Sequence, residues 1–549
     1  MKTVIIGGVA GGAGAATRLR RLDESMEIII LERGNYISYA NCGLPYYIGD
    51  IIKSRDNILI QTPEVMKSRY NIDVRVNNNV LKIDKDAKKV VVENSNEQYE
   101  ESYDNLIIAT GSSPIKPPIP GIENEGIHTL WNVDDADYIR NLVDVKKPKS
   151  VAVVGGGFIG LEVAENLHAR GVEVSIIEAQ NQVMAPVDFE MAQLLHENID
   201  KNGVNLYLGD GVSSFEANDG GITVNLAGGK AVKVDIVILS IGVRPNSELA
   251  RDAGLDLNQK GGIVVDKYLR TSDENIWAVG DVIEVENFIT KERVMIPLAG
   301  PANKQARIVA NNIAGIQEVY EGSMGTSVAQ VFDMTVAATG INEKTLITKG
   351  FKKNEDYYSI VIGQKSHAGY YPDATKMFLK LLFKKDGTIL GAQIVGMDGV
   401  DKRIDTIATT ISFGGSVYDL KRLELAYAPP FSSAKDPVNM LGFVADNVLS
   451  GKANFVAHNE LDGKFILDVG EAGERRVFRL ADSYHIPLGQ LRDRIDELNP
   501  EDEIVTYCAI GVRSYNAARI LLNHGFKNVS ILQGGVSFYK SVVKNFTHD

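Results

Sequence analysis

Two glycine-rich turns, each placed between an apolar strand and a helix, constrain the fold of this chain more than any other feature. The first lies in TVIIGGVAGGAGAATRLRRL at residues 3–22, and the second in SVAVVGGGFIGLEVAENLHARGVEVSIIEA at residues 150–179. Such a turn brings backbone N–H groups and a helix N-terminus close to a pyrophosphate. The sequence therefore predicts two dinucleotide-binding βαβ units, one after the other.

The first turn carries most of the dinucleotide pattern. Gly7 and Gly12 are the turn and helix glycines, and Glu32 ends the next strand, EIIILE, where it can bind a ribose hydroxyl. The pattern departs at its middle glycine, which is Val9 here. The alternative is an ordinary βαβ unit without a bound nucleotide.

The second turn is complete, with Gly155, Gly157 and Gly160 after a strand and Glu178 at the end of the next strand. A carboxylate at this position prefers a free 2′-hydroxyl and repels a 2′-phosphate. The residues that follow, AQNQ, supply no arginine for a phosphate. The second site is therefore predicted to prefer NADH, with NADPH as the alternative.

The length and charge of the chain narrow the class of protein. At 549 residues the chain is too long for one core, so several domains are expected. The net charge of −13 argues against a nucleic-acid partner, and no apolar run is long enough for a membrane helix. With only two cysteines a disulfide framework is excluded, and a cytoplasmic location is expected.

Further motifs between and after the two turns identify a family resemblance. YDNLIIATGSSP lies between them, and NIWAVGD follows the second. This order resembles the FAD-dependent pyridine nucleotide-disulfide oxidoreductases over roughly residues 1–445. The resemblance implies Rossmann-like domains for FAD and NAD(P)H, then an α+β dimerisation domain. It also implies that Thr110, Gly111 and Asp281 contact FAD.

Cys42 lies in the segment YISYANCGLPYYIGD, residues 36–50. Many members of the family carry a CxxxxC pair, but Tyr47 stands where the second cysteine would fall. The single-cysteine members include NADH peroxidases, NADH oxidases and coenzyme A disulfide reductases. The first two imply a histidine in the first glycine turn, where this chain has Ala10. For a Cys42 thiolate at a helix N-terminus that faces an oxidised flavin, we expect a lowered thiol pKa.

Three segments resemble coenzyme A disulfide reductases: SYANCGLPY, AGYYP at 368–372 and LAYAPPFSSAKD at 425–436. The resemblance implies a mixed disulfide between Cys42 and coenzyme A. It also implies a homodimer in which Tyr427, with Tyr370 or Tyr371, reaches the site from the partner subunit. The remaining implied coenzyme A contacts are Gly14, Arg18, Arg21, Ser38, Asn41, Asn303 and Lys435.

The chemistry of these residues is consistent with that interpretation. Arg18 and Arg21 are three apart on a predicted helix, share a face and suit the phosphates of coenzyme A. The alternative is a solvated basic face. Tyr427 can donate a proton to a leaving thiolate, whereas the alternative for Tyr427 and Tyr370 is interface packing.

The last hundred residues alternate between strand and helix patterns, which predicts a small parallel α/β domain. The segments HIPL and CAIGVR, followed by a GG after the last strand, resemble a rhodanese domain. The resemblance implies that Cys508 carries a persulfide and that Arg513 closes the loop or attracts an anionic sulfur donor. His485 is interpreted as structural. The alternative is an inactive domain used for binding.

Together these features predict an α/β protein with FAD, NADH and coenzyme A as ligands. The expected function is reduction of coenzyme A disulfide, coenzyme A persulfide and polysulfides. The alternatives are an NADH oxidase or peroxidase, a sulfurtransferase that serves a protein acceptor, and a redox sensor. The expected domains are FAD-binding (1–112 and 241–322), NAD-binding (113–240), dimerisation (323–446), a linker (447–457) and rhodanese (458–549).

Overall fold

The computed structural model describes residues 1–543 and confirms the predicted α/β class. The chain divides into two compact units, which are described separately. The first comprises Met1–Asn181 and Val204–Gly325, and the second comprises Gln182–Gly203 and the chain from Thr326 onward. Among the described residues, no helix has the length and apolar character needed to cross a membrane.

The first unit contains a five-stranded parallel sheet in the order β19-β7-β1-β2-β3. Apart from β3, its strands are almost fully buried, because Val4, Ile5 and their neighbours belong to a core that includes residues of α1, α8 and the segment 80–92. Helix α1 follows β1 and packs on α8. The bounds are β1 Lys2–Ile6, α1 Ala10–Leu22, β2 Glu27–Leu31, β3 Asp73–Arg75, β7 Asn105–Ile108, β19 Ile276–Ala278 and α8 Ala299–Ile313.

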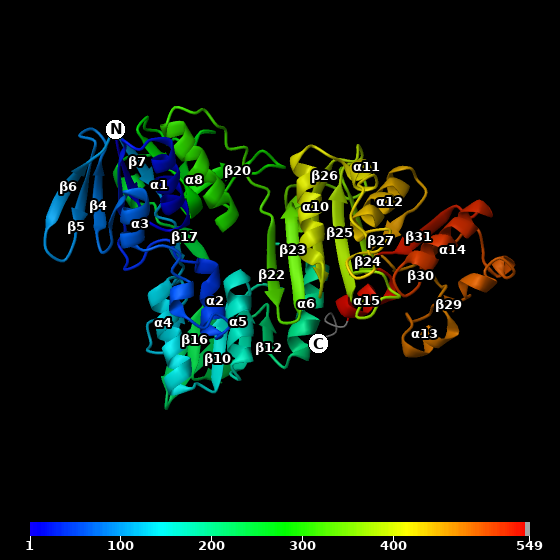
Figure 1. Cartoon of the computed structure of the whole chain (residues 1–549). Coiled ribbons are helices and arrows are strands. Elements are labelled where there is room, and N and C mark those ends of the chain that lie inside the picture. Colours follow the sequence, from blue (N-terminus) through cyan, green and yellow to red (C-terminus); the bar gives the residue numbers. More distant parts are fainter. Residues whose placement is uncertain (544–549) are drawn as a thin grey trace. The chain divides into compact units, whose positions relative to one another are not determined.

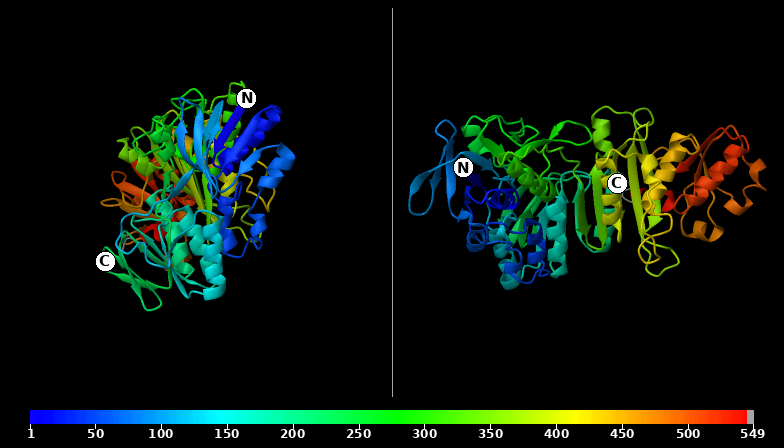
Figure 2. Two further views of the ribbon diagram at one scale, coloured as in Figure 1. Left: turned by 90° about the vertical axis from the view of Figure 1, so that its left-hand side faces the viewer. Right: turned by 45° about the horizontal axis from the view of Figure 1, so that its top comes forward.

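A second parallel sheet, β12-β11-β10-β16-β9, repeats this plan in the same unit. In both repeats a three-stranded antiparallel ribbon precedes the strand that pairs with the central strand of the sheet, β7 with β1 and β16 with β10. The first ribbon, β4–β6, stands beside β7 in Figure 1 and projects from its sheet in the right-hand view of Figure 2. The bounds are β9 Ile127–Thr129, α4 Val133–Asn141, β10 Ser150–Val154, α5 Phe158–Ala169, β11 Glu173–Glu178, β12 Asn205–Leu208 and β16 Ile236–Leu239. The ribbons are β4 Asn79–Asp84, β5 Lys89–Glu93, β6 Gln98–Ser102, β13 Val212–Asn218, β14 Gly221–Leu226 and β15 Ala231–Val234.

The second unit is built on an antiparallel sheet in the order β22-β23-β26-β25-β24. Helix α10 packs on β23 and β26, and α12 packs on β24 and β25. Helix α6 contacts β22 and β26, although its sequence belongs to the predicted NAD-binding segment. The bounds are α6 Phe189–Lys201, β22 Ser327–Val331, β23 Met334–Gly340, β24 Tyr358–Lys365, β25 Lys376–Phe383, β26 Ile389–Gly396, α10 Val400–Ser412 and α12 Pro437–Leu449.

A buried lysine joins α6 to this sheet. The Lys380 side chain is 1% exposed and its ammonium lies 2.9 Å from Asp188 and 2.6 Å from Glu343. It also contacts Glu190. An isolated buried ammonium would be strongly destabilising, so these carboxylates are required partners.

The C-terminal part of the second unit is a parallel sheet in the order β27-β31-β30-β28-β29. Within the predicted linker, 447–457, α12 continues to Leu449 and β27 pairs with β31. The bounds are β27 Phe455–Val456, β28 Phe465–Asp468, α13 Ala472–Val477, β29 Tyr484–His485, β30 Glu503–Tyr507, α14 Val512–Asn523, β31 Asn528–Leu532 and α15 Gly535–Val543.

This C-terminal domain is fixed against β24. The Gly534 N–H donates to the carbonyl of Val361 at 2.9 Å, and the Gln533 side chain donates to the carbonyl of Ser359 at 3.0 Å. Helix α15 lies beside β24 in Figure 1. The shorter elements are α2 Leu44–Ile48, α3 Pro63–Tyr70, β8 Ser112–Pro114, β17 Val243–Pro245, α7 Glu248–Asp252, β18 Ile263–Val264, β20 Ile283–Glu286, β21 Arg293–Val294, α9 Glu343–Thr348 and α11 Val417–Leu420.

Candidate active site

The first glycine turn has the geometry that its sequence predicts. Gly7 adopts φ +101°, which other residues rarely tolerate. A Cβ at Gly12 would overlap the carbonyl oxygen of Gly7, so helix and strand can approach only with glycine there. The Glu32 carboxylate accepts hydrogen bonds from the N–H groups of Gly8 and Gly34, both at 2.8 Å. Glu32 therefore lies at the mouth of the turn.

The second turn repeats this arrangement. Gly155 adopts φ +110°, and a Cβ at Gly160 would overlap the Gly155 carbonyl. The Glu178 carboxylate accepts from the N–H groups of Gly156 and Gln180, both at 2.8 Å. The same carboxylate-to-turn bond thus occurs at both predicted nucleotide sites.

The space beside both turns fits a bound dinucleotide. A Cβ built on Gly157, at the start of α5, would meet nothing within 4 Å, and the same holds for Gly111. Thr110 beside Gly111 is fixed by its hydroxyl, which donates to the Asn246 carbonyl at 2.6 Å. Asp281 accepts from Ser112 at 3.1 Å, and burial raises the pKa of its carboxyl. At Gly157 and Gly111, two of the predicted cofactor contacts, the backbone therefore has open space beside it.

Cys42 is exposed and lies in a single 3₁₀ turn, Asn41–Gly43, directly before α2. The lowered thiol pKa is expected for a thiolate that faces an oxidised flavin, whereas the protein atoms by themselves shift the pKa of Cys42 in the opposite direction. Surrounding protein atoms raise the pKa of Cys42, and the negative charges of Glu162 and Asp281 raise it further. Helix α2 has only five residues, so its dipole is too weak to offset the effect of the two carboxylates on the pKa of the thiol.

Glu162 is the neighbour of Cys42 that the sequence did not single out. It lies on α5 in the NAD-binding part, and burial together with the charge of Glu165 raises its pKa to about 7. Tyr46 of α2 hydrogen bonds to Glu162, and burial raises the pKa of Tyr46 to about 12. A reactive thiol, a carboxylate and a phenol therefore lie where the two nucleotide-binding parts meet.

Several predicted coenzyme A contacts line the seam between α1 and α8. Arg18 donates to the side chain of Asn311 at 2.9 Å. Gly14 permits close helix packing, since a Cβ there would lie 3.0 Å from Ala306 and 3.9 Å from Asn303. Arg21 is exposed, with its guanidinium over the Tyr70 ring. The seam thus brings Gly14, Arg18 and Asn303 together.

The segment before Cys42 returns to the first glycine turn. Ser38 adopts φ +44°, and its N–H donates to the Gly8 carbonyl at 2.8 Å. The Ser38 carbonyl in turn accepts from Ile60. These bonds place Asn41 and Cys42 next to the predicted FAD turn.

In the second unit, Tyr370 and Tyr427 form a pair. Their hydroxyls are 2.6 Å apart, and both side chains are exposed. The hydrogen bond with Tyr370 raises the pKa of Tyr427. Tyr371 instead packs edge-on against His367, so Tyr370 is the partner of Tyr427. Lys435 is also exposed, just before α12.

Cys508 ends β30 and begins the loop that leads into α14. Its side chain is buried, and the Gly511 N–H donates to its sulfur at 3.2 Å. The carbonyls of Cys508 and Ala509 accept from the first turn of α15, which fixes the loop. His485 hydrogen bonds to the Gly470 carbonyl at 2.9 Å, in agreement with a structural role.

Arg513 lies beside two acidic side chains of the same domain. Its guanidinium makes a two-point contact with Glu474, at 2.8 and 2.7 Å, and lies 3.9 Å from Glu471. The bond to Glu474 raises the pKa of Arg513, and Cys508 raises it further. Arg513 therefore bridges α13 and the Cys508 loop.

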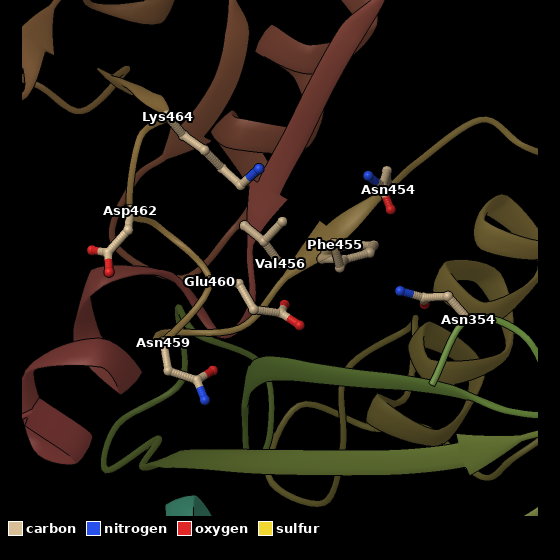
Figure 3. Close-up of a pocket in the computed structure, with 8 residues that line it drawn as sticks. All are labelled: Asn354, Asn454, Phe455, Val456, Asn459, Glu460, Asp462 and Lys464. Carbon is tan, nitrogen blue, oxygen red and sulfur yellow. The ribbon is translucent and has the colours of Figure 1, made fainter. Parts of the chain in front are cut away.

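An open cavity of about 430 Å³ lies elsewhere in the second unit (Figure 3). Two of its charged lining residues are paired, Glu460 with Lys353 and Lys464 with Glu503. None of its lining residues is a cysteine or tyrosine, so it offers no thiol chemistry. They are Asn354, Asn454, Phe455, Val456, Asn459, Glu460, Asp462 and Lys464.

Three family models match the chain. Pyridine nucleotide-disulphide oxidoreductase matches residues 1–306, its dimerisation domain matches 326–437, and the rhodanese-like domain matches 454–541. Together these matches agree with the predicted order of domains.

Individual relatives agree with the family models. The crystal structure of reduced Bacillus anthracis CoADR-RHD is 48% identical with a TM-score of 0.96, covering 99% of this chain and 98% of that one. An NAD-dependent persulfide reductase from A. fulgidus is 39% identical with a TM-score of 0.93, covering 98% and 100%. The coenzyme A disulfide reductase of Staphylococcus epidermidis is 35% identical over 81% of this chain and 99% of its own length.

Proposed function

This chain belongs to the pyridine nucleotide-disulphide oxidoreductase family, and we propose that it reduces coenzyme A disulfide, coenzyme A persulfide and polysulfides at Cys42. NADH is the proposed reductant, because Glu178 would face the ribose and repel a 2′-phosphate. FAD is proposed at the first turn, beside Gly7 and Glu32.

One observation carries this proposal: the exposed Cys42 lies between the two nucleotide-binding parts. Asp281 belongs to the FAD side and Glu162 to the NAD side, and both act on the pKa of the Cys42 thiol. The chain has only two cysteines, and the second is buried in another domain. The proposed redox partner of Cys42 is therefore a thiol from outside the chain, that of coenzyme A.

The proposed chemistry on Cys42 is thiol exchange followed by reduction. The Cys42 thiolate attacks the inner sulfur of coenzyme A persulfide, forms the mixed disulfide and releases hydrosulfide. When bound, FAD and NADH supply two electrons to that disulfide. With one proton, the S–S bond breaks to give the Cys42 thiolate and free coenzyme A.

The seam between α1 and α8 is the proposed coenzyme A site. Arg18 and Arg21 supply charge for the phosphates, Asn303 borders the same seam, and Ser38 with Asn41 lead the chain to Cys42. In a homodimer, Tyr427, held by Tyr370, would donate the proton to the leaving thiolate, and Lys435 would contact the coenzyme A phosphates.

Cys508 is proposed to carry sulfane sulfur as a persulfide. The Gly511 N–H at its sulfur and the N-terminus of α14 suit an anionic sulfur. Sulfur on Cys508 would then pass to coenzyme A, and the product would be the substrate of Cys42.

Steady-state rates test whether Cys42 carries out the reduction while Cys508 carries sulfur. NADH oxidation is followed with coenzyme A disulfide and with coenzyme A persulfide, using wild type, Cys42→Ser and Cys508→Ser. Cys42→Ser should abolish both activities, whereas Cys508→Ser should retain both. Full disulfide reduction by Cys42→Ser would refute the proposal. Peroxide or oxygen turnover that matches persulfide turnover would favour the oxidase alternative instead.

A further inference from the structure

The charges around the Cys508 loop limit the sulfur donors that it can accept. Arg513 is the only cation in the segment CAIGVR, and its guanidinium is already held by Glu474. Glu471 adds a second carboxylate at 3.9 Å. The positive charge that faces the loop is therefore compensated before any donor binds.

The neighbouring cation is compensated as well. Arg475 of α13 donates to the Asp468 carboxylate at 2.9 Å and also to Ser483. Asp468 is almost fully buried and ends β28, so this pair is part of the domain core. Arg513 and Arg475 together thus face three carboxylates.

The remaining side chains of the loop are small or apolar. Ala509, Ile510 and Val512 surround Gly511, and Val512 is 53% exposed next to Arg513. Ile510 packs on β24, because a Cβ at Gly363 would lie 3.4 Å from it. The loop thus offers backbone N–H groups and hydrocarbon to a donor, but little positive charge.

We infer that Cys508 takes sulfur from donors whose sulfane sulfur is bonded to a thiol sulfur, as in organic hydropersulfides, and discriminates against thiosulfate. This inference rests on the proposed sulfur-carrier role of Cys508. In thiosulfate the sulfane sulfur is bonded directly to a sulfonate, so its charge must enter the loop. In an organic hydropersulfide the sulfane sulfur is bonded to a neutral sulfur that carries the carbon group, and any charged group lies farther away.

The transfer balances without an oxidant. The Cys508 thiolate attacks the terminal sulfur of R–S–SH, a new S–S bond forms on Cys508, and the S–S bond of the donor breaks. The thiolate R–S⁻ leaves and takes a proton from solvent. With thiosulfate, the leaving group would be sulfite, a dianion expelled beside Glu474 and Glu471.

Single-turnover persulfidation tests the inference on the full-length chain. The Cys42→Ser variant, in which Cys508 is the only cysteine, is mixed with glutathione hydropersulfide or with thiosulfate. Intact mass spectrometry then follows the added sulfur, which a reducing agent removes. The hydropersulfide should react at least about tenfold faster, since like charges brought together are costly.

Glu474→Gln in the same background releases the charge of Arg513. The amide can still accept from the Glu471 N–H, so the cap of α13 is retained. The ratio of the thiosulfate rate to the hydropersulfide rate should rise about three- to fivefold, as for a partly exposed ion pair. Glu497→Gln, which removes a carboxylate paired with Arg494 in the same domain, should leave the ratio unchanged.

The outcomes separate the inference from the function on which it rests. Equal rates with both donors in Cys42→Ser, or no change in the ratio with Glu474→Gln, would overturn the inference alone. No sulfur on Cys508 with either donor would overturn both the inference and the proposed sulfur-carrier role.

Discussion

At the residue scale, the chemistry of this molecule depends on contacts between residues far apart in the sequence. Cys42 was evident from its motif, but Glu162, which acts on its pKa, is 120 positions away. Local pattern predicted a helix N-terminus and a lowered pKa. The fold adds surrounding protein atoms and the two carboxylates of Glu162 and Asp281, and these decide the direction of the pKa shift.

Glu162→Gln should lower the pKa of the Cys42 thiol, because it removes a negative charge that disfavours the thiolate. The rate of Cys42 alkylation against pH, measured in Cys508→Ser, reports this pKa. The profile should move to lower pH, and most clearly above pH 7, where Glu162 itself is charged. Glu123→Gln, at an exposed site, is the control. An unchanged profile would remove Glu162 from this role.

Glu178 should control the choice between NADH and NADPH. Its carboxylate lies at the second glycine turn and accepts from Gly156 and Gln180. Glu178→Ala removes a charged hydrogen-bond acceptor, so kcat/KM for NADH should fall about tenfold or more. The value of kcat/KM for NADPH should fall less, because the variant no longer has a carboxylate that repels the 2′-phosphate. Steady-state kinetics with both nucleotides measure the ratio, and Glu173→Ala, at the exposed start of β11, should not change it.

At the element scale, the strand–turn–helix units were predictable from the sequence, but the sheets against which other elements pack were not. The strand, turn and helix around Gly7 and Gly155 follow from local sequence, since only glycine fits those backbone angles. That α6 joins the antiparallel sheet depends on the contact of Lys380 with Asp188 and Glu190, which are about 190 positions away. The place of β27 in the last sheet likewise depends on pairing with β31.

Lys380→Met should loosen this sheet, because it leaves three carboxylates near one another without their ammonium. Removing one partner of a buried ion pair costs about 3–5 kcal/mol. Amide hydrogen exchange in β25 should accelerate accordingly. Lys385→Met, at an exposed position just after β25, should leave exchange near wild type. Equal protection of the β25 amides from exchange in both variants would show that the ion pairs of Lys380 contribute little to the stability of the sheet.

At the scale of the whole molecule, the antiparallel domain exposes large apolar side chains next to the tyrosine pair. Phe431 is 72% exposed and Tyr370 is 76% exposed. The dimerisation model matches residues 326–437, which include both. Such side chains are typical of a surface covered by a partner.

Phe431→Asp should therefore weaken the proposed homodimer, because it places a charge in an apolar interface. Light scattering after size exclusion should show monomer at concentrations where wild type is dimeric. Coenzyme A disulfide reduction should fall with the dimer fraction, since Tyr427 would come from the partner. Val145→Asp, an exposed site in the first unit, is the control. A fully active monomer would contradict a shared site.

The central claim is that Cys42 forms a mixed disulfide with coenzyme A, and one measurement tests it directly. The reduced protein is mixed with coenzyme A disulfide in the absence of NADH, and its intact mass and peptides are analysed without reductant. One coenzyme A should be found on Cys42 in wild type and in Cys508→Ser, and none in Cys42→Ser. An unmodified Cys42, or coenzyme A found only on Cys508, would contradict the claim.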